Sequence, residues 1–240
     1  MQCRVSRLEH RSFFLSRWWK THACYNQLTN SDMAVDPLEI LFGSQARVKL
    51  LRFFLFNPSK EFTFDDISRR ARLVRRTART EMNALERAGV IKKKQIYIKD
   101  EAKGKKVRVQ GYALDKTFPE LQALQTFLFE TAPLDGKTVL KHLRTAGKLD
   151  FVCIAGIFVR DFEQRLDIML AMPKLDMKKV ENAIRALESE IGIEIRFAAF
   201  STEDLFYRIG MYDKLTREVF DYTHQILVDK VDVRDELHRP

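Results

Sequence analysis

The sequence has few of the features that mark secreted, membrane-spanning and metal-binding proteins. Its 240 residues include only three cysteines, too few for a disulfide framework, so we expect a reducing, cytoplasmic location. No apolar run approaches the length needed to cross a bilayer, and the apolar patch in the first 20 residues is too interrupted for a signal peptide. His22 and Cys24 have no second ligand pair at zinc spacing, so we expect no metal and no cofactor.

Charge is plentiful and unevenly distributed. The hydrophobic content of 45% and the charged content of 31% are typical of a folded protein, and the length allows two domains. Residues 65–110 contain 15 Lys and Arg against 6 Asp and Glu, whereas residues 111–240 contain 18 against 22. This asymmetry predicts two domains with different partners, although a charge run can also be only a solvated helical face.

Three helices and a hairpin are predicted in the basic part of the chain. Helical spacing of apolar residues predicts a helix over residues 45–56 that Asn57-Pro58 ends, and a second helix begins near Asp65. The third helix ends at Gly89, and its inward side is predicted to carry Val74, Ala78, Met82 and Leu85. The β-rich runs IKKKQIYIKD and KKVRVQGYAL, joined by residues 101–104, predict a hairpin.

This order of elements, with the junction LERAGVI before the hairpin, resembles the winged helix-turn-helix domain of bacterial transcription regulators. The domain is expected over residues 34–116. In such domains the third helix enters the DNA major groove, where Arg reads guanine and Asn reads adenine. No Ser, Thr, Asp or Asn directly precedes Arg75, so the start of this helix lacks the usual side-chain cap. The expected DNA contacts lie on the second and third helices and the hairpin tip: Arg69, Arg70, Arg72, Arg75, Arg76, Arg79, Thr80, Asn83, Lys103, Lys105 and Lys106.

Residues 117–230 follow the order helix, strand, strand, helix, strand and resemble the minimal nucleotidyltransferase domain. In that superfamily the first strand ends in Gly-Ser, and an Asp-x-Asp pair on the second strand holds two magnesium ions. Gly156 and Asp167 occupy matching positions, but Ile157 replaces the serine and Met169 the second aspartate. A thioether is a poor ligand for magnesium, so we expect no catalysis. Two helical stretches to about residue 227 and a tail over residues 231–240 complete the prediction.

A second Gly-Ser pair stands in LFGSQAR, residues 41–47. No Asp-x-Asp follows on a strand about ten residues later, because that stretch is the apolar helix RVKLLRFFLF. We therefore expect Ser44 to cap a helix rather than to hold a phosphate.

From about Met33 the chain resembles a family of small bacterial proteins that join a winged helix to a degenerate nucleotidyltransferase-like domain. The resemblance implies an α+β protein that binds double-stranded DNA and regulates transcription. Its second domain is expected to sense a nucleotide or other small molecule in a cleft around Gly156 and Asp167, to form a homodimer, or to serve only as structural support. The alternative is a metal-dependent nucleotidyltransferase acting on protein or RNA. Residues 1–33 are expected to be a disordered extension, or to arise from an upstream start codon.

Overall fold

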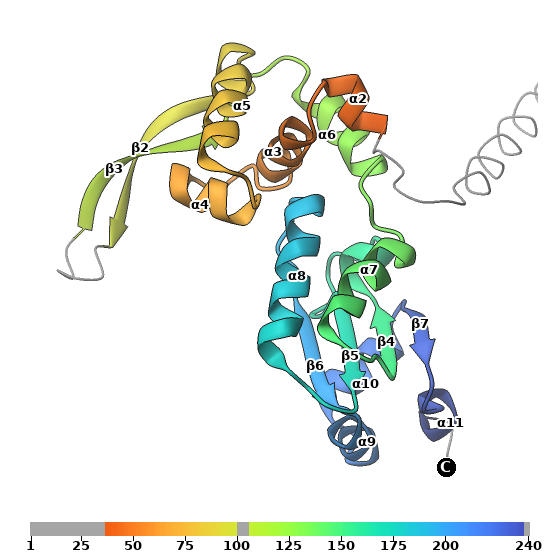
Figure 1. Ribbon diagram of the computed structural model, residues 1–240. Helices are drawn as coiled ribbons and strands as arrows, with labels where there is room; N and C mark the ends of the chain where they lie inside the picture. The colour runs from red at the N-terminus through yellow and green to blue at the C-terminus, as the bar shows by residue number, and fades with distance from the viewer. Residues whose placement is uncertain (1–36, 100–105, 238–240) are drawn as a thin grey trace, which may run out of the picture. The chain divides into compact units, whose positions relative to one another are not determined.

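The computed structural model describes residues 37–99 and 106–237 (Figure 1). Its contacts divide the chain into two compact units that meet between Gly43 and Ser44. In the first unit the described element is helix α2 (Pro37–Phe42); the extension expected over residues 1–33 lies outside the described residues. The second unit contains helices and two sheets, so the expected mixed α+β class is confirmed.

Helix α3 (Gln45–Leu55) begins at LFGSQAR as predicted. The Ser44 hydroxyl accepts a hydrogen bond from the Arg47 backbone N–H at 3.4 Å, which makes Ser44 a helix cap. At the other end, the Asn57 side-chain amide donates to the Phe53 carbonyl at 2.8 Å. The apolar side chains that predicted this helix are all buried: Val48, Leu51, Phe54 and Leu55.

Helices α4 (Phe64–Arg70) and α5 (Arg75–Arg87) follow α3; α5 packs beside α3, and α4 contacts α5 and the later helix at residues 177–191. The predicted inward side of α5 is confirmed for Ala78, Met82 and Leu85, which are buried, but is wrong for Val74, which is 74% exposed. Val74 precedes the helix and has an extended backbone, so its side chain is out of phase with the helical stripe. No side chain caps α5, in agreement with the sequence.

Gly89 ends α5 in the predicted left-handed turn, with φ of +78°. The Val90 N–H donates to the Leu85 carbonyl and the Gly89 N–H to the Glu86 carbonyl, both at 3.0 Å. This pair of bonds is a Schellman motif, which satisfies carbonyls that the helix leaves open.

A three-stranded antiparallel sheet follows α5. Strands β2 (Ile91–Lys99) and β3 (Lys106–Leu114) form the predicted hairpin, and its turn lies outside the described residues. The short strand β1 (Phe62–Thr63) pairs with β3, giving the order β1-β3-β2.

The rest of the unit is built around a four-stranded sheet of order β6-β5-β4-β7. Strands β5 and β6 are parallel, and the other neighbours are antiparallel. The elements are α6 (Leu121–Glu130), α7 (Gly136–Leu143), the 3-10 helix η1 (Arg144–Ala146), β4 (Phe151–Ile154), the 3-10 helix η2 (Gly156–Val159), β5 (Ile168–Met172), α8 (Met177–Ile191), β6 (Phe197–Ser201), α9 (Thr202–Gly210), α10 (Lys214–Asp221), β7 (Gln225–Asp229) and α11 (Val233–Leu237).

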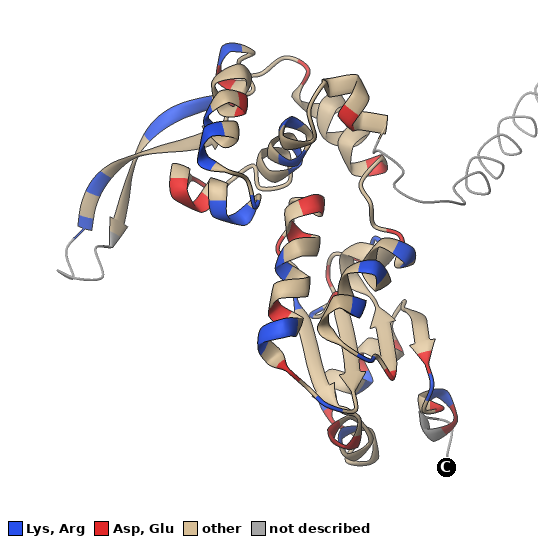
Figure 2. Ribbon diagram, viewed as in Figure 1, with Lys and Arg blue, Asp and Glu red and all other residues tan. Residues whose placement is uncertain are grey.

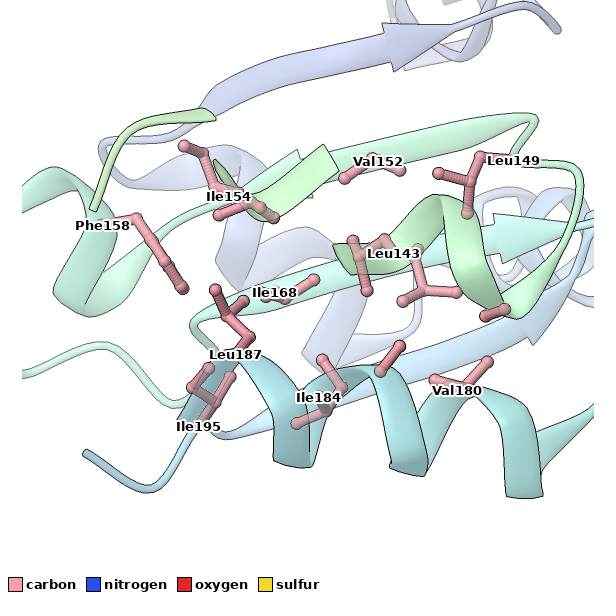
Figure 3. Close-up of a cluster of buried hydrophobic side chains, with 14 of the residues drawn as sticks. Leu143, Leu149, Val152, Ile154, Phe158, Ile168, Val180, Ile184, Leu187 and Ile195 are labelled. Atoms are coloured by element: carbon pink, nitrogen blue, oxygen red, sulfur yellow. The ribbon is translucent and has the colours of Figure 1, made fainter. Parts of the chain in front are cut away.

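Alternation along the central strands divides their side chains between two layers of helices. Val152 and Ile154 of β4 point toward α7 and α8, where Figure 3 shows Val180, Ile184 and Leu187 of α8 facing the sheet. The intervening β4 residues belong to a second cluster that includes side chains of α9, α10 and α11. The sheet is therefore a central layer with apolar packing on both faces.

Two expectations for the C-terminal stretch are wrong. The helical prediction to about residue 227 misses strand β7, which pairs antiparallel with the outer edge of β4. The tail predicted over residues 231–240 contains α11, whose Val233 is fully buried, and the Val233 N–H donates to Asp229 Oδ1 at 3.0 Å. Pairing with β4 and burial of Val233 are tertiary effects that override the local pattern.

From Ser44 onward, the residues of the two expected domains lie in one compact unit, in which α3 contacts α8. Gly192, which ends α8 with φ of +85°, is the point of closest approach: a Cβ there would lie 2.7 Å from the backbone of Arg52 and of Phe53. The Asn57 side-chain amide also donates to the Gly192 carbonyl at 2.9 Å. Among the residues described, no helix has the length and apolar character to span a membrane.

We expect Gly192→Ala to destabilise the protein more than Gly89→Ala. Both glycines have positive φ, which costs an alanine about 1–2 kcal/mol. Gly89 has no heavy atom within 4 Å of an added Cβ, whereas Gly192 meets the α3 backbone. Overpacking of this kind costs about 1–3 kcal/mol in addition. Urea unfolding measures both variants, and equal losses would contradict the close approach of α3 and α8.

Candidate nucleic-acid interface and the buried carboxylate

The outward side of α5 carries five of the eleven predicted DNA contacts. These side chains are exposed: Arg75, Arg76, Arg79, Thr80 and Asn83. Phe64 of α4 lies beneath two of them, with the guanidinium carbons of Arg75 and Arg79 at 5.4 and 4.9 Å from its ring centroid. This stacking positions the two guanidinium groups at the start of the helix.

The start of α5 is electrostatically suited to an anion. Its first turn contains Arg75 and Arg76 and no acidic residue, although the positive end of a helix dipole favours negative charge. Arg75 pairs with Asp65 at 2.7 Å, but Arg76 has no carboxylate partner among the described residues. A phosphate placed here would meet open backbone N–H groups and a free guanidinium.

The arginines of α4 and of the turn after it each have an acceptor within the protein: Arg69, Arg70 and Arg72. Arg69 is exposed and pairs with Asp66 of its own helix at 2.6 Å, and Arg70 lies 3.6 Å from Glu194. Arg72 was expected to contact DNA, but its guanidinium donates to the Asn182 carbonyl on α8 at 3.3 Å. Its left-handed backbone, with φ of +53°, ends α4 and precedes α5. The structure therefore does not group Arg72 with the α5 side chains.

The hairpin adds cations at its outer end. The strand register places Lys106 opposite Lys99 and Arg108 opposite Tyr97. The sequence analysis missed Tyr97 and Arg108, both exposed, although the alternation in IYIK and VRVQ places them on one side. Lys103 and Lys105 lie outside the described residues. Figure 2 shows Lys and Arg along α4, α5 and the hairpin.

Three lysines of β2 are neutralised within the fold. Lys92 pairs with Asp115 at 3.0 Å, Lys93 with Glu86 at 2.7 Å, and Lys94 with Glu61. The hydrogen bond to Glu86 raises the pKa of Lys93. The pKa of Asp115 is lowered to about 2. The largest cause is the hydrogen bond from the Thr117 backbone N–H, followed by those from the Thr117 hydroxyl and from Lys92. These lysines are less available to an external anion than Arg76.

Asp167, the single carboxylate in the transferase-like pattern, is fully buried at the start of β5. Its Oδ1 accepts from the Ile157 N–H at 3.0 Å and from Arg196 Nη2 at 2.9 Å. Its Oδ2 accepts from the backbone N–H and Nε of Arg196, at 2.8 and 3.0 Å. The hydrogen bond to Asp167 raises the pKa of the Arg196 guanidinium.

The cleft predicted around Gly156 and Asp167 is filled. The structure does bring the two residues together, since a Cβ at Gly156 would collide with Asp167 Oδ1, but both are buried. Arg196 and two backbone N–H groups occupy the carboxylate oxygens that a metal or ligand would need. Met169, at the second aspartate position, is 1% exposed. Within residues 37–99 and 106–237, no group of three His, Cys, Asp or Glu side chains could hold a metal.

Comparison with known proteins adds no assignment. No protein-family model matches the chain, and neither a curated protein nor a solved structure matches it. Function therefore has to be argued from the chain's own residues.

We expect Asp167→Asn to destabilise the fold without exposing a reactive site. The amide places a donor against the Arg196 guanidinium and backbone N–H groups, and each buried donor left unpaired costs about 1–3 kcal/mol. The exposed pair Arg217–Asp221, at 3.5 Å, provides the control. Asp221→Asn should change the free energy of unfolding by less than about 0.5 kcal/mol. Chemical denaturation compares the variants, and a fully stable Asp167→Asn protein would refute the structural role.

Proposed function

We propose that the protein is a cytoplasmic DNA-binding transcriptional regulator. In this proposal residues 34–116 form a winged helix-turn-helix domain, with α5 as the recognition helix and the β2–β3 hairpin as the wing. The observation that carries it is the exposed, mostly unneutralised cation cluster at the start of α5, formed by Arg75, Arg76 and Arg79.

The arrangement of elements supports this assignment. Helices α3, α4 and α5 are followed by an antiparallel hairpin, and β1 joins that hairpin from the stretch between α3 and α4. Arg47 of α3 pairs with the buried Glu81 of α5 at 2.8 Å, which fixes α5 on its inward side. The outward side is left exposed, as a helix that enters the major groove requires.

The residue types on α5 suit both anchoring and reading of DNA. Arg76 and Arg79 carry guanidinium forks that match phosphate oxygens or the O6 and N7 atoms of guanine. Asn83, two turns further along the helix, is exposed and can pair with adenine. Lys106 and Arg108 of the hairpin would contact the backbone beside the groove.

For residues 117–230 we propose a degenerate nucleotidyltransferase-like domain without catalytic activity. The parallel pair β5 and β6 and the contact between Gly156 and Asp167 support the resemblance. The engagement of Asp167 by Arg196 supports a structural use of the one remaining carboxylate. Regulators of this kind bind DNA as symmetric dimers, and we propose a homodimer here as well. Exposed Tyr207, Met211 and Tyr212 of the α9 region are candidates for that interface.

Removing two arginines of α5 should weaken DNA binding and its dependence on salt. Each phosphate contact contributes about 0.9 to the slope of log K against log salt concentration. We expect Arg76→Ala/Arg79→Ala to lower the magnitude of the slope by up to about 2 on a mixed-sequence duplex. Fluorescence anisotropy over a salt series measures it.

Arg165→Ala/Arg217→Ala is the matched control, because it removes the same charge from exposed positions elsewhere, with side chains 61% and 64% exposed. Its slope should equal that of the wild type. Equal effects of the two double variants, or no binding to DNA at low salt, would rule out α5 as the recognition helix. Selection from a randomised duplex pool then gives the preferred site.

A further inference from the structure

A cleft of about 380 Å³ lies within the second unit, between the α3–α4 region and the end of α8. Its apolar part is formed by Phe53 and Ile193, and its polar part includes Arg70, Arg185, Glu188 and Glu194. A volume of this size falls within the range of about 300–1,000 Å³ typical of small-molecule sites. It is a different place from the filled site at Asp167.

The arginines of the cleft have hydrogen-bonding capacity to spare. Arg70 lies 3.6 Å from Glu194, and Arg185 pairs with Glu181 at 3.0 Å, with side chains 43% and 64% exposed. A guanidinium has five N–H donors, and one carboxylate uses at most two of them. Exposed ion pairs contribute little free energy, so an incoming anion can share or replace these partners at small cost.

The two carboxylates of the cleft are already engaged. Glu188 Oε1 accepts the Ile195 backbone N–H at 2.8 Å, and burial raises the pKa of Glu188, which reduces its tendency to ionise. Glu194 is shared between Lys60, at 3.4 Å, and Arg70. With Arg69 also in the lining, cationic side chains outnumber anionic ones. The remaining carboxylate lone pairs can accept hydrogen bonds from hydroxyl groups.

We propose that this cleft binds a nucleoside monophosphate. The phosphate would lie between Arg70 and Arg185, since its three oxygens can accept from two guanidinium groups at once. The ribose hydroxyls would donate to Glu188 or Glu194, and the base would cover Ile193 and the small part of Phe53, 5% exposed, that lines the cleft. Each part of the ligand thus has a matching part of the cleft.

Such a ligand would also influence DNA binding, a consequence that rests on the proposed function. Arg69 and Arg70 both belong to α4, the helix that carries Phe64 beneath the α5 arginines. A bound phosphate would hold Arg70 in the cleft and would place negative charge beside Arg69, so that both cations are less available to the DNA backbone. We therefore expect the ligand to lower DNA affinity.

Isothermal titration calorimetry of the full chain with AMP, GMP, CMP and UMP, without DNA, tests the site. At least one of them should bind more tightly than ribose 5-phosphate, which lacks the base, and than adenosine, which lacks the phosphate. Arg185→Ala should weaken that binding by about 10-fold or more, as expected for loss of a charge-assisted hydrogen bond. Arg217→Ala is the matched control, because Arg217 also pairs at i,i+4 and its side chain is equally exposed, at 64%.

Three results would overturn the assignment: no heat of binding with any of the four nucleotides at millimolar concentration, ribose 5-phosphate binding as tightly as the nucleotides, or equal losses in the Arg185 and Arg217 variants. The titration is carried out without DNA and the tested residue, Arg185, lies on α8. If the protein failed to bind DNA, the nucleotide-binding result would therefore still be valid. Conversely, Arg185→Ala should retain full DNA affinity in the absence of nucleotide, which separates the two proposals.

Discussion

The arrangement of the second unit depends on a buried arginine that holds two helix ends. Arg52 of α3 is 3% exposed, and its guanidinium donates to the Thr131 carbonyl at the end of α6 and to the Glu190 carbonyl at the end of α8, at 3.1 and 3.4 Å. The last carbonyls of a helix have no partner within it and carry partial negative charge. One side chain thus satisfies two such ends, while Gly192 lets the backbones approach. Since α5 packs beside α3, and α4 contacts α5 and α8, the position of both helices relative to the four-stranded sheet depends on the contact between α3 and α8.

The charged groups on the two sides of this contact differ in exposure: Asp167 is buried and hydrogen-bonded, whereas the arginines of α5 are exposed. At Asp167 a carboxylate in a catalytic-like position is surrounded by N–H donors and held by Arg196, so its charge stabilises the connection between β4, β5 and β6. On α5 the cations remain exposed, and Arg76 lacks a carboxylate partner among the described residues. The spacing of Gly156 and Asp167 therefore serves packing in this structure, and the exposed cations of α5 are the charges left available to an external partner.

Local signals in the sequence were sufficient for several helix ends, but not for elements and contacts that depend on tertiary pairing. Ser44 and Gly89 were correctly placed because a cap or a left-handed turn depends on a few neighbouring residues. Strand β7 was missed because a five-residue strand is defined by its pairing with β4, which no local pattern encodes. The filled state of the Gly156 and Asp167 site was equally hidden, since Arg196 lies 29 residues after Asp167. The positive charge of Arg196 was the one available signal, since a cation on the neighbouring strand is a suitable partner for the Asp167 carboxylate.

Helix α4 is where the two proposals meet. One side of it lines the cleft through Arg69 and Arg70, and Phe64 at its start supports Arg75 and Arg79 of α5. A ligand that competes with DNA for the cations of α4 must itself bind less tightly when DNA is present, by the same factor, because thermodynamic linkage is reciprocal. The effect needs no large movement: α4 is short, and the exposed partners of Arg69 and Arg70 can be exchanged at little free-energy cost. Under the two proposals, a ligand held by α4 and α8 would regulate DNA binding from a surface separate from the buried Asp167.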